Sequence, residues 1–451
     1  MGRLVSPERV GRGLALAALL SAGGCTAPRD AARPARMLDT TTVGRIAGYL
    51  DRGLGRLSRD STRGILDLLA AVHLNPRAHE FGYLLAWGHL VAKDTLGLVR
   101  WLDSLATWRS CLTPSPETFA PMAGNRAVAD AMTRVRDAAP NEHRSTVAFS
   151  LPSRDLFPEG IAYDSVEPAF FLSSLRHRTV VRVTRDASGR VDAREFVPPG
   201  SDSLYSVLGM KVDAGRRRLW VVTAGEGFAV NERPEEVGRS AILVYDLTTG
   251  RRLRRWPVSP PPNRLTNDIS LDPAGDAYIT DTPAAMIYRA RFDADSVETF
   301  IPAGKLRAPN GIVVTPDGRK ALVADAMSGV WVVDLATRAL SRLPQPPGIM
   351  PLFLDGLDLH RGALIGVTHA LSGGWVLRFS MSAGYDSIRT SEVLDCNHPA
   401  MRQPTTGVVV GDTLFYVATS QFRSFAKGQP WPNDRLADIT VLRLGLPTAA
   451  P

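Results

Sequence analysis

The segment Asn310-Gly-Ile-Val-Val-Thr-Pro-Asp-Gly-Arg-Lys-Ala-Leu-Val-Ala-Asp325 decides the fold class. It places a polar residue and a glycine before two runs rich in apolar residues, and a Pro-Asp-Gly turn separates the two runs. Alternation with a period of two is typical of β-strands, and Asp-Gly is a strong hairpin signal. The segment therefore predicts a hairpin whose first strand begins beside Asn310.

The same pattern occurs six times after residue 145, about once in every 50 residues. Each copy has one residue followed by Gly, or once by Asp, then an apolar strand, a turn and a second apolar strand. The residues at the first repeat position are Glu159, Leu208, Asn267, Asn310, Asp355 and Thr406. The spacing suits a four-stranded blade, and six copies predict a closed six-bladed β-propeller over residues 145–447. Closure removes exposed sheet edges, and we expect the strands at 146–151 and 439–444 to share the last blade.

Residues 41–142 have a different periodicity. Ile65, Leu68 and Val72 recur at helical spacing, as do Leu84, Trp87 and Val91. The fold class expected for the whole chain is therefore mainly β, a six-bladed propeller preceded by a small α-helical domain.

The first 25 residues are typical of an export signal. Basic residues precede a short apolar run at 14–22, which is too short to span a bilayer. The run ends in Ser-Ala-Gly-Gly-Cys25, which resembles a bacterial lipobox, so Cys25 is the predicted lipidation site. Residues 26–40 then form a tether, and the protein is a lipoprotein of the bacterial periplasm or outer membrane, held to the membrane only through its lipid. An ordinary secretory signal is the alternative.

Composition excludes some partners. Hydrophobic content of 44% and charged content of 22% are ordinary for a globular protein. The formal charge of +8 comes mostly from dispersed Arg residues, without the basic face and interleaved aromatics that a nucleic-acid partner requires. Cys111 and Cys396 lie in different predicted domains, and the sequence leaves open whether they pair or remain two separate thiols.

The six repeat positions define a predicted ring at one end of the central channel. Five of the six carry side-chain oxygens, and none is His, Cys, Lys or Arg. Two carboxylates and two amides suit Ca²⁺ or another divalent cation, whereas zinc favours nitrogen or sulfur. The rest of the channel is expected to be lined by apolar strands. The competing interpretation is that Asn-Gly and Asp-Gly here are ordinary turns.

Four motifs resemble those of the gluconolactonase/regucalcin family and, more distantly, paraoxonases and strictosidine-synthase-like proteins. They are Phe157-Pro-Glu-Gly-Ile, Thr266-Asn-Asp-Ile-Ser-Leu-Asp, Pro309-Asn-Gly-Ile and Asp355-Gly-Leu-Asp. The resemblance implies that Glu159, Asn310 and Asp355 bind Ca²⁺, with Asn267 at the metal or touching substrate. The chain departs from the family in the second blade, where Leu208 is apolar, and in its helical N-terminal region.

Two functions follow as hypotheses. The first is a Ca²⁺-dependent hydrolase of a lactone or ester, with Asp355 or His369 activating water and with Asn267 and Thr406 contacting a small-molecule substrate. His369 is a candidate because it ends the second strand of the fifth blade, beside the ring. The second hypothesis is a non-catalytic binding propeller at the cell envelope with a structural calcium ion. The sequence shows no clear proton-transfer residue at the channel, which favours the second hypothesis.

Overall fold

The computed structural model describes residues 37–140, 143–258, 263–369, 371, 373–426 and 429–448. The predicted signal, the lipidation site Cys25 and most of the tether lie outside these residues. The described chain forms two compact units, residues 44–139 and residues 37–43 with 140–448. Within the described residues, no helix combines the length and the apolar character needed to cross a membrane.

The first unit is helical. Its elements are α1 (Thr40–Arg56), α2 (Ser61–Leu74), α3 (His79–Val91), α4 (Thr95–Thr107), α5 (Pro116–Phe119), η2 (Ala120–Met122) and α6 (Arg126–Ala138). Short polar side chains cap the starts of several helices, because the first amides of a helix lack internal partners. Asp60, Asp94 and Asn125 accept from the amides of α2, α4 and α6 respectively. The expected helical region is confirmed.

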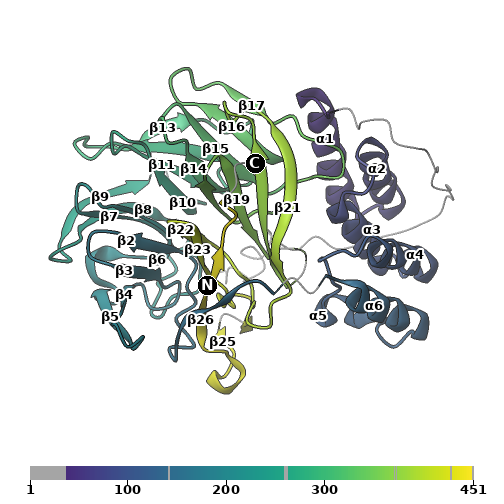
Figure 1. The fold of residues 1–451 in the computed structure, drawn as a ribbon, viewed down its shortest axis with the longest axis horizontal. Coiled ribbons are helices and arrows are strands. Elements are labelled where there is room, and N and C mark those ends of the chain that lie inside the picture. Colours follow the sequence, from purple (N-terminus) through teal and green to yellow (C-terminus); the bar gives the residue numbers. More distant parts are fainter. Residues whose placement is uncertain are drawn as a thin grey trace, which may run out of the picture. The chain divides into compact units, whose positions relative to one another are not determined.

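The second unit is a six-bladed β-propeller, as predicted, and Figure 1 shows its sheets in blue, teal, green and yellow. Each blade is a four-stranded antiparallel sheet. The first three blades are β2 (Ile161–Asp164), β3 (Ala169–Ser173), β4 (Val180–Arg185) and β5 (Val191–Val197); β6 (Ser206–Asp213), β7 (Arg218–Ala224), β8 (Ser240–Asp246) and β9 (Arg252–Val258); and β10 (Thr266–Leu271), β11 (Ala277–Asp281), β12 (Met286–Ala290) and β13 (Glu298–Ile301).

The fourth and fifth blades continue this order. They are β14 (Pro309–Val314), β15 (Lys320–Asp325), β16 (Gly329–Asp334) and β17 (Leu340–Arg342), then β18 (Gly356–His360), β19 (Ala363–Thr368), β20 (Trp375–Met381) and β21 (Ile388–Cys396). The sixth blade joins both ends of the propeller sequence: β22 (Gly407–Val410), β23 (Thr413–Val417), β26 (Ile439–Gly445) and β1 (Thr146–Leu151). A small hairpin, β24 (Phe425–Ala426) and β25 (Gln429–Pro430), lies in the loop between β23 and β26.

The ring of blades closes as expected. β1 pairs antiparallel with β26, and each inner strand contacts the inner strand of the next blade all the way around. Leu38, which falls in the predicted tether, exchanges two backbone hydrogen bonds with Gln345 of the propeller, at 2.8 and 3.1 Å. The closed ring leaves no free inner edge, which is the physical reason for pairing the first strand with the last.

The glycine of each repeat lets neighbouring inner strands approach closely. A Cβ atom on Gly209 would lie 2.7 Å from the Asn267 carbonyl oxygen, and one on Gly356 would lie 2.6 Å from the Thr406 Cα. Gly160 and Gly311 are closer still to the backbone of the next blade. These glycines are therefore packing residues of strands rather than turn residues, and the ordinary-turn interpretation of the repeat is wrong.

Candidate metal centre at the mouth of the channel

The six repeat residues lie next to one another around the channel. Most successive pairs are joined by the glycine contacts described above or by side-chain hydrogen bonds. Asn267 and Asn310 are linked instead through Thr282, whose hydroxyl accepts from Asn267 and donates to the Pro309 carbonyl oxygen. Irregular register in β6, β10 and β14 falls between Val207 and Met210, Thr266 and Ile269, and Pro309 and Ile312. Leu208, Asn267 and Asn310 thus occupy bulges of the inner strands, and bulges commonly re-aim side chains beside functional sites.

Three side-chain oxygens of this ring have no hydrogen-bond partner although they are buried: Oε2 of Glu159, Oδ1 of Asn267 and Oδ1 of Asn310. The Glu159 and Asn267 residues are only 7% and 8% exposed. A buried acceptor without a partner costs about 1–3 kcal/mol. Unpaired buried oxygens at three positions of the repeat therefore make the ring a candidate site for a ligand that supplies positive charge or donors.

Hydrogen bonds orient both amides. Nδ2 of Asn310 donates to Oδ1 of Asp355 at 2.7 Å, and Nδ2 of Asn267 donates to Thr282 Oγ1 at 2.9 Å. An ionised carboxylate accepts only, so the Asn310 amide nitrogen must face Asp355 and its oxygen must face away. The two asparagines are thereby held with their oxygens available for a cation.

His369 contacts the ring, as the sequence led us to expect. Its Nδ1 atom lies 2.9 Å from the Pro404 carbonyl oxygen and 3.1 Å from Oδ2 of Asp355. His369 and Asp355 are each more than nine-tenths buried. A carbonyl oxygen accepts only, so Nδ1 carries a hydrogen and Nε2 is the basic atom of the neutral imidazole. Phe422 packs edge-on against the imidazole at 5.0 Å between ring centroids.

Thr406 has a different contact from the predicted one. Its hydroxyl donates to the Glu159 carbonyl oxygen at 2.6 Å, and Thr405 donates to the same oxygen at 2.7 Å. These bonds join the sixth blade to the first and hold Glu159 in place. The structure gives Thr406 a positioning contact, and its role as a substrate contact stays a prediction.

The sequence analysis missed Glu226, which follows β7. Its Oε1 atom is buried without a partner, and its charge acts on Glu159. Burial first, and then the charge of Glu232, raises the pKa of Glu226 to about 8. Burial, followed by the charges of Asp355, Asp268 and Glu226, raises the pKa of Glu159 well above its ordinary value. The second blade thus contributes a carboxylate from a loop although its ring residue is Leu208.

The expectation of an apolar channel is wrong. Asp268, Lys211 and Asp358 project from the inner strands of three blades, and Nζ of Lys211 lies 3.9 Å from Oδ2 of Asp358. Gly160, Lys211 and Asp268 are among the residues that line a cavity of about 10 Å³ in the channel. Ile161, Met210, Ile269 and Leu357 line the same cavity, so the wall of the channel is mixed rather than apolar throughout.

The donor set fits a hard cation better than a transition metal. Among the described residues, no three His, Cys, Asp or Glu side chains are grouped closely enough to hold a metal ion. A cation at the ring would therefore take amide oxygens along with carboxylates, and Glu159, Asn267, Asn310 and Asp355 provide that mixture. Oxygen-only coordination of this kind suits Ca²⁺.

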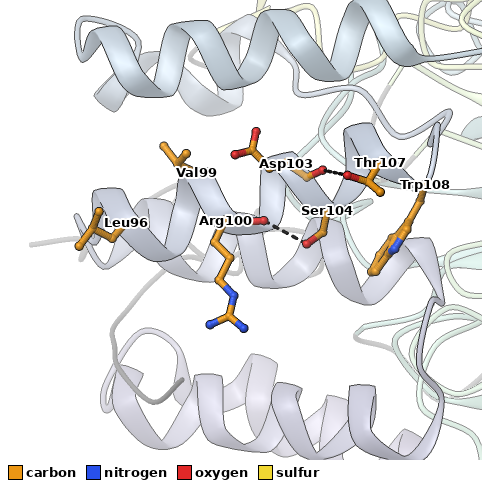
Figure 2. Close-up of a pocket in the computed structure, with 7 residues that line it drawn as sticks. All are labelled: Leu96, Val99, Arg100, Asp103, Ser104, Thr107 and Trp108. Atoms are coloured by element: carbon orange, nitrogen blue, oxygen red, sulfur yellow. Dashed lines mark hydrogen bonds between the residues drawn. The ribbon is translucent and has the colours of Figure 1, made fainter. Parts of the chain in front are cut away.

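A larger hollow lies on the helical unit and lacks these features. Figure 2 shows it along α4, with a volume of about 470 Å³ and residues from Leu96 to Trp108 in its wall. Its hydroxyl groups bond to their own helix, Ser104 to the Arg100 carbonyl and Thr107 to the Asp103 carbonyl. Asp103 is paired with Arg134 at 2.7 Å. The polar groups of this hollow are already satisfied, so it is not a candidate site.

Comparison with known proteins assigns neither a family nor an activity to the chain. No protein-family model and no curated protein matches the chain. Solved structures similar to it include a gluconolactonase from Xanthomonas campestris (18% identity, TM-score 0.44, 67% of this chain and 89% of that chain). A second is a PQQ-bound aldose sugar dehydrogenase from Streptomyces coelicolor, with 13% identity, a TM-score of 0.45, and coverage of 68% of this chain and 99% of that chain. A third is a virginiamycin B lyase from Staphylococcus aureus, with 12% identity, a TM-score of 0.42, and coverage of 66% of this chain and 98% of that chain. Their names describe three kinds of enzyme, and these likenesses assign no activity here.

Proposed function

We propose that this protein is a divalent-cation-dependent hydrolase of a lactone or ester, with Ca²⁺ as the preferred ion. The observation that carries the proposal is the set of unpartnered oxygens on Glu159, Asn267 and Asn310 beside the carboxylate of Asp355. The motif resemblance to the gluconolactonase/regucalcin family supports the same assignment. When bound, the ion would supply Lewis-acid polarisation of the substrate carbonyl.

The residues of the chain would have distinct tasks in this reaction. Asp355 accepts from Asn310, and its Oδ2 atom lies 3.1 Å from Nδ1 of His369. The Pro404 carbonyl oxygen accepts the hydrogen of Nδ1, so the imidazole is held with Nε2 as its basic atom. His369 would take a proton from water at Nε2, which relieves Asp355 of that role. This division is favourable because a cation lowers the basicity of a carboxylate that it contacts directly.

A non-catalytic binding propeller with a structural cation is the second candidate function. It is favoured by the hydrogen bonds that connect the ring residues to the blades, since Thr405 and Thr406 hold Glu159 and Thr282 holds Asn267. A cation at the ring would complete this network in either case. The two functions differ in whether Nε2 of His369 performs proton transfer.

Turnover by the full-length protein distinguishes them. Aryl esters and lactones of several ring sizes would be assayed with calcium, with chelator, and with the variants His369→Asn and Asp355→Asn. The hydrolase proposal requires turnover that chelator abolishes and calcium restores. Cation binding without turnover of any substrate in the panel would support the binding propeller instead.

We further propose that the protein is exported and carries lipid on Cys25, from the basic residues, the apolar run and the small residues before this cysteine. Mass spectrometry of the membrane fraction from the native cells is the test. A diacylglycerol-modified N-terminus at Cys25 is expected. A soluble mature chain with an unmodified N-terminus would contradict lipidation.

A further inference from the structure

A partly buried lysine lies on the inner strand of the second blade, three residues beyond the ring residue Leu208. Nζ of Lys211 is 3.9 Å from Oδ2 of Asp358, and the side chains are 28% and 16% exposed. Lys211 and Asp268 also line the same small cavity of the channel. The inner strands β6, β10 and β18 thus bring one cation and two carboxylates together in the channel.

Both carboxylates also join neighbouring blades. Oδ2 of Asp268 accepts from the amide of Ile312 at 3.0 Å, and Oδ2 of Asp358 accepts from the amide of Val409 at 2.9 Å. Their other oxygens accept from the next amide in their own strands, at 2.8 Å each. Both carboxyl groups lie in a sheltered part of the channel, where negative charge is stabilised by a nearby positive charge. Lys211 supplies that charge.

Little empty space remains beside Lys211 in the channel. Glycines bring the strand backbones together, and the cavity that includes Lys211 measures about 10 Å³. An ammonium group is a compact point charge with three donors, whereas a guanidinium is a broad planar fork. Lysine at this position therefore matches the space, in a chain whose basic residues are nearly all arginine.

We propose that the Lys211 ammonium is the resident cation of a second cation position in the channel, and that it keeps free ions out of that position. Asp268 and Asp358 hold it. Lys211 is a positioning residue, because its single charge offsets part of the negative charge of two carboxylates that connect blades three to four and five to six. The inference does not depend on the hydrolase activity. It leaves Glu159 and Asp355 as the carboxylates for an ion at the ring.

Cation rescue of a side-chain deletion tests this directly. In full-length Lys211→Ala, the thermal midpoint should fall by roughly 5 °C in choline chloride, whose cation is too bulky for the channel. Methylammonium or potassium chloride at the same ionic strength should restore it, and calcium titration should reveal one more bound cation than in wild type. Lys320→Ala is the matched control, since Lys320 donates to the Gly384 carbonyl at 2.5 Å in an exposed contact. It should show no such salt dependence.

Two results would overturn the proposal: Lys211→Ala melting like wild type in every salt, or a loss of stability that none of these cations restores. If Lys211→Ala does not fold, two further variants decide the matter. The double variant Asp268→Asn/Asp358→Asn leaves the Lys211 ammonium without a carboxylate partner. The triple variant adds Lys211→Met to this pair and so removes all three charges. The triple variant should melt at a higher temperature than the double variant. Equal midpoints would contradict a charge-specific role for Lys211.

Discussion

The side-chain amide of Asn310 donates a 2.7 Å hydrogen bond to Oδ1 of Asp355, while its own carbonyl oxygen has no partner. One asparagine therefore connects the fourth blade to the fifth and still presents an acceptor. The arrangement is costly without a ligand, since an unpaired buried acceptor lowers the free energy of unfolding. It becomes favourable when a cation binds that oxygen.

Replacing Asn310 by Asp should make the protein depend more strongly on calcium. Asn310→Asp removes the donor and sets a carboxylate beside Asp355, so the thermal midpoint in chelator should fall. Calcium should raise the midpoint of Asn310→Asp by more than it raises that of wild type, because the added charge is neutralised on binding. Asn433→Asp, at an exposed position, is the control. Equal calcium shifts in Asn310→Asp and wild type would argue against a cation at Asn310.

Stability of the metal-free protein should decrease as pH rises. Burial raises the pKa of Glu159 and that of Glu226, the latter to about 8. The folded state then binds more protons than the unfolded state between about pH 4.5 and the folded pKa, so the free energy of unfolding falls across this window, by up to roughly 1.4 kcal/mol per pH unit for each group. Thermal melts in chelator at pH 5 and pH 8 measure the effect. Glu226→Gln should flatten the profile, and an unchanged profile in that variant would contradict the assignment.

Replacing His369 should lower the turnover number far more than it lowers the affinity for the cation. His369→Asn keeps an amide donor near the place of Nδ1 and removes the basic Nε2. If His369 transfers protons, kcat on the best ester or lactone should fall by about 10²- to 10⁴-fold, while the calcium affinity stays within a few-fold. A normal kcat in His369→Asn would remove this residue from the chemistry.

Adding a methyl group at a repeat glycine should loosen the ring. In Gly311→Ala the new Cβ would collide with the Asp355 carbonyl oxygen, so the variant should lose about 1–3 kcal/mol in the free energy of unfolding and bind calcium more weakly. Gly445→Ala is the matched control, since a Cβ there meets no atom within 4 Å. Denaturant unfolding of both variants, with and without calcium, makes the comparison. Similar stabilities would mean that the close approach of β14 and β18 is not needed.

The repeat predicted the fold and most of the ring because propeller geometry converts sequence period into position. Glu159, Asn267, Asn310 and Asp355 share one repeat position, so symmetry alone brings them together. The sequence did not predict Glu226 because this residue lies in an irregular loop, to which the repeat pattern does not extend. The sequence did not single out Lys211, Asp268 and Asp358 because they lie away from the ring position: Lys211 and Asp358 each follow their ring residue by three positions, and Asp268 follows Asn267 by one. Their proximity depends on how three strands pass one another in the channel.

The central claim is that the ring binds a divalent cation, and calorimetric titration of calcium into chelator-treated full-length protein tests it most directly. The account predicts saturable binding at one site, weakened at least about tenfold, or 1.4 kcal/mol, in Asp355→Asn and in Glu159→Gln. Zinc should bind less tightly than calcium. Absence of saturable calcium binding to wild type, or equal binding by wild type and the double variant Glu159→Gln/Asp355→Asn, would contradict it.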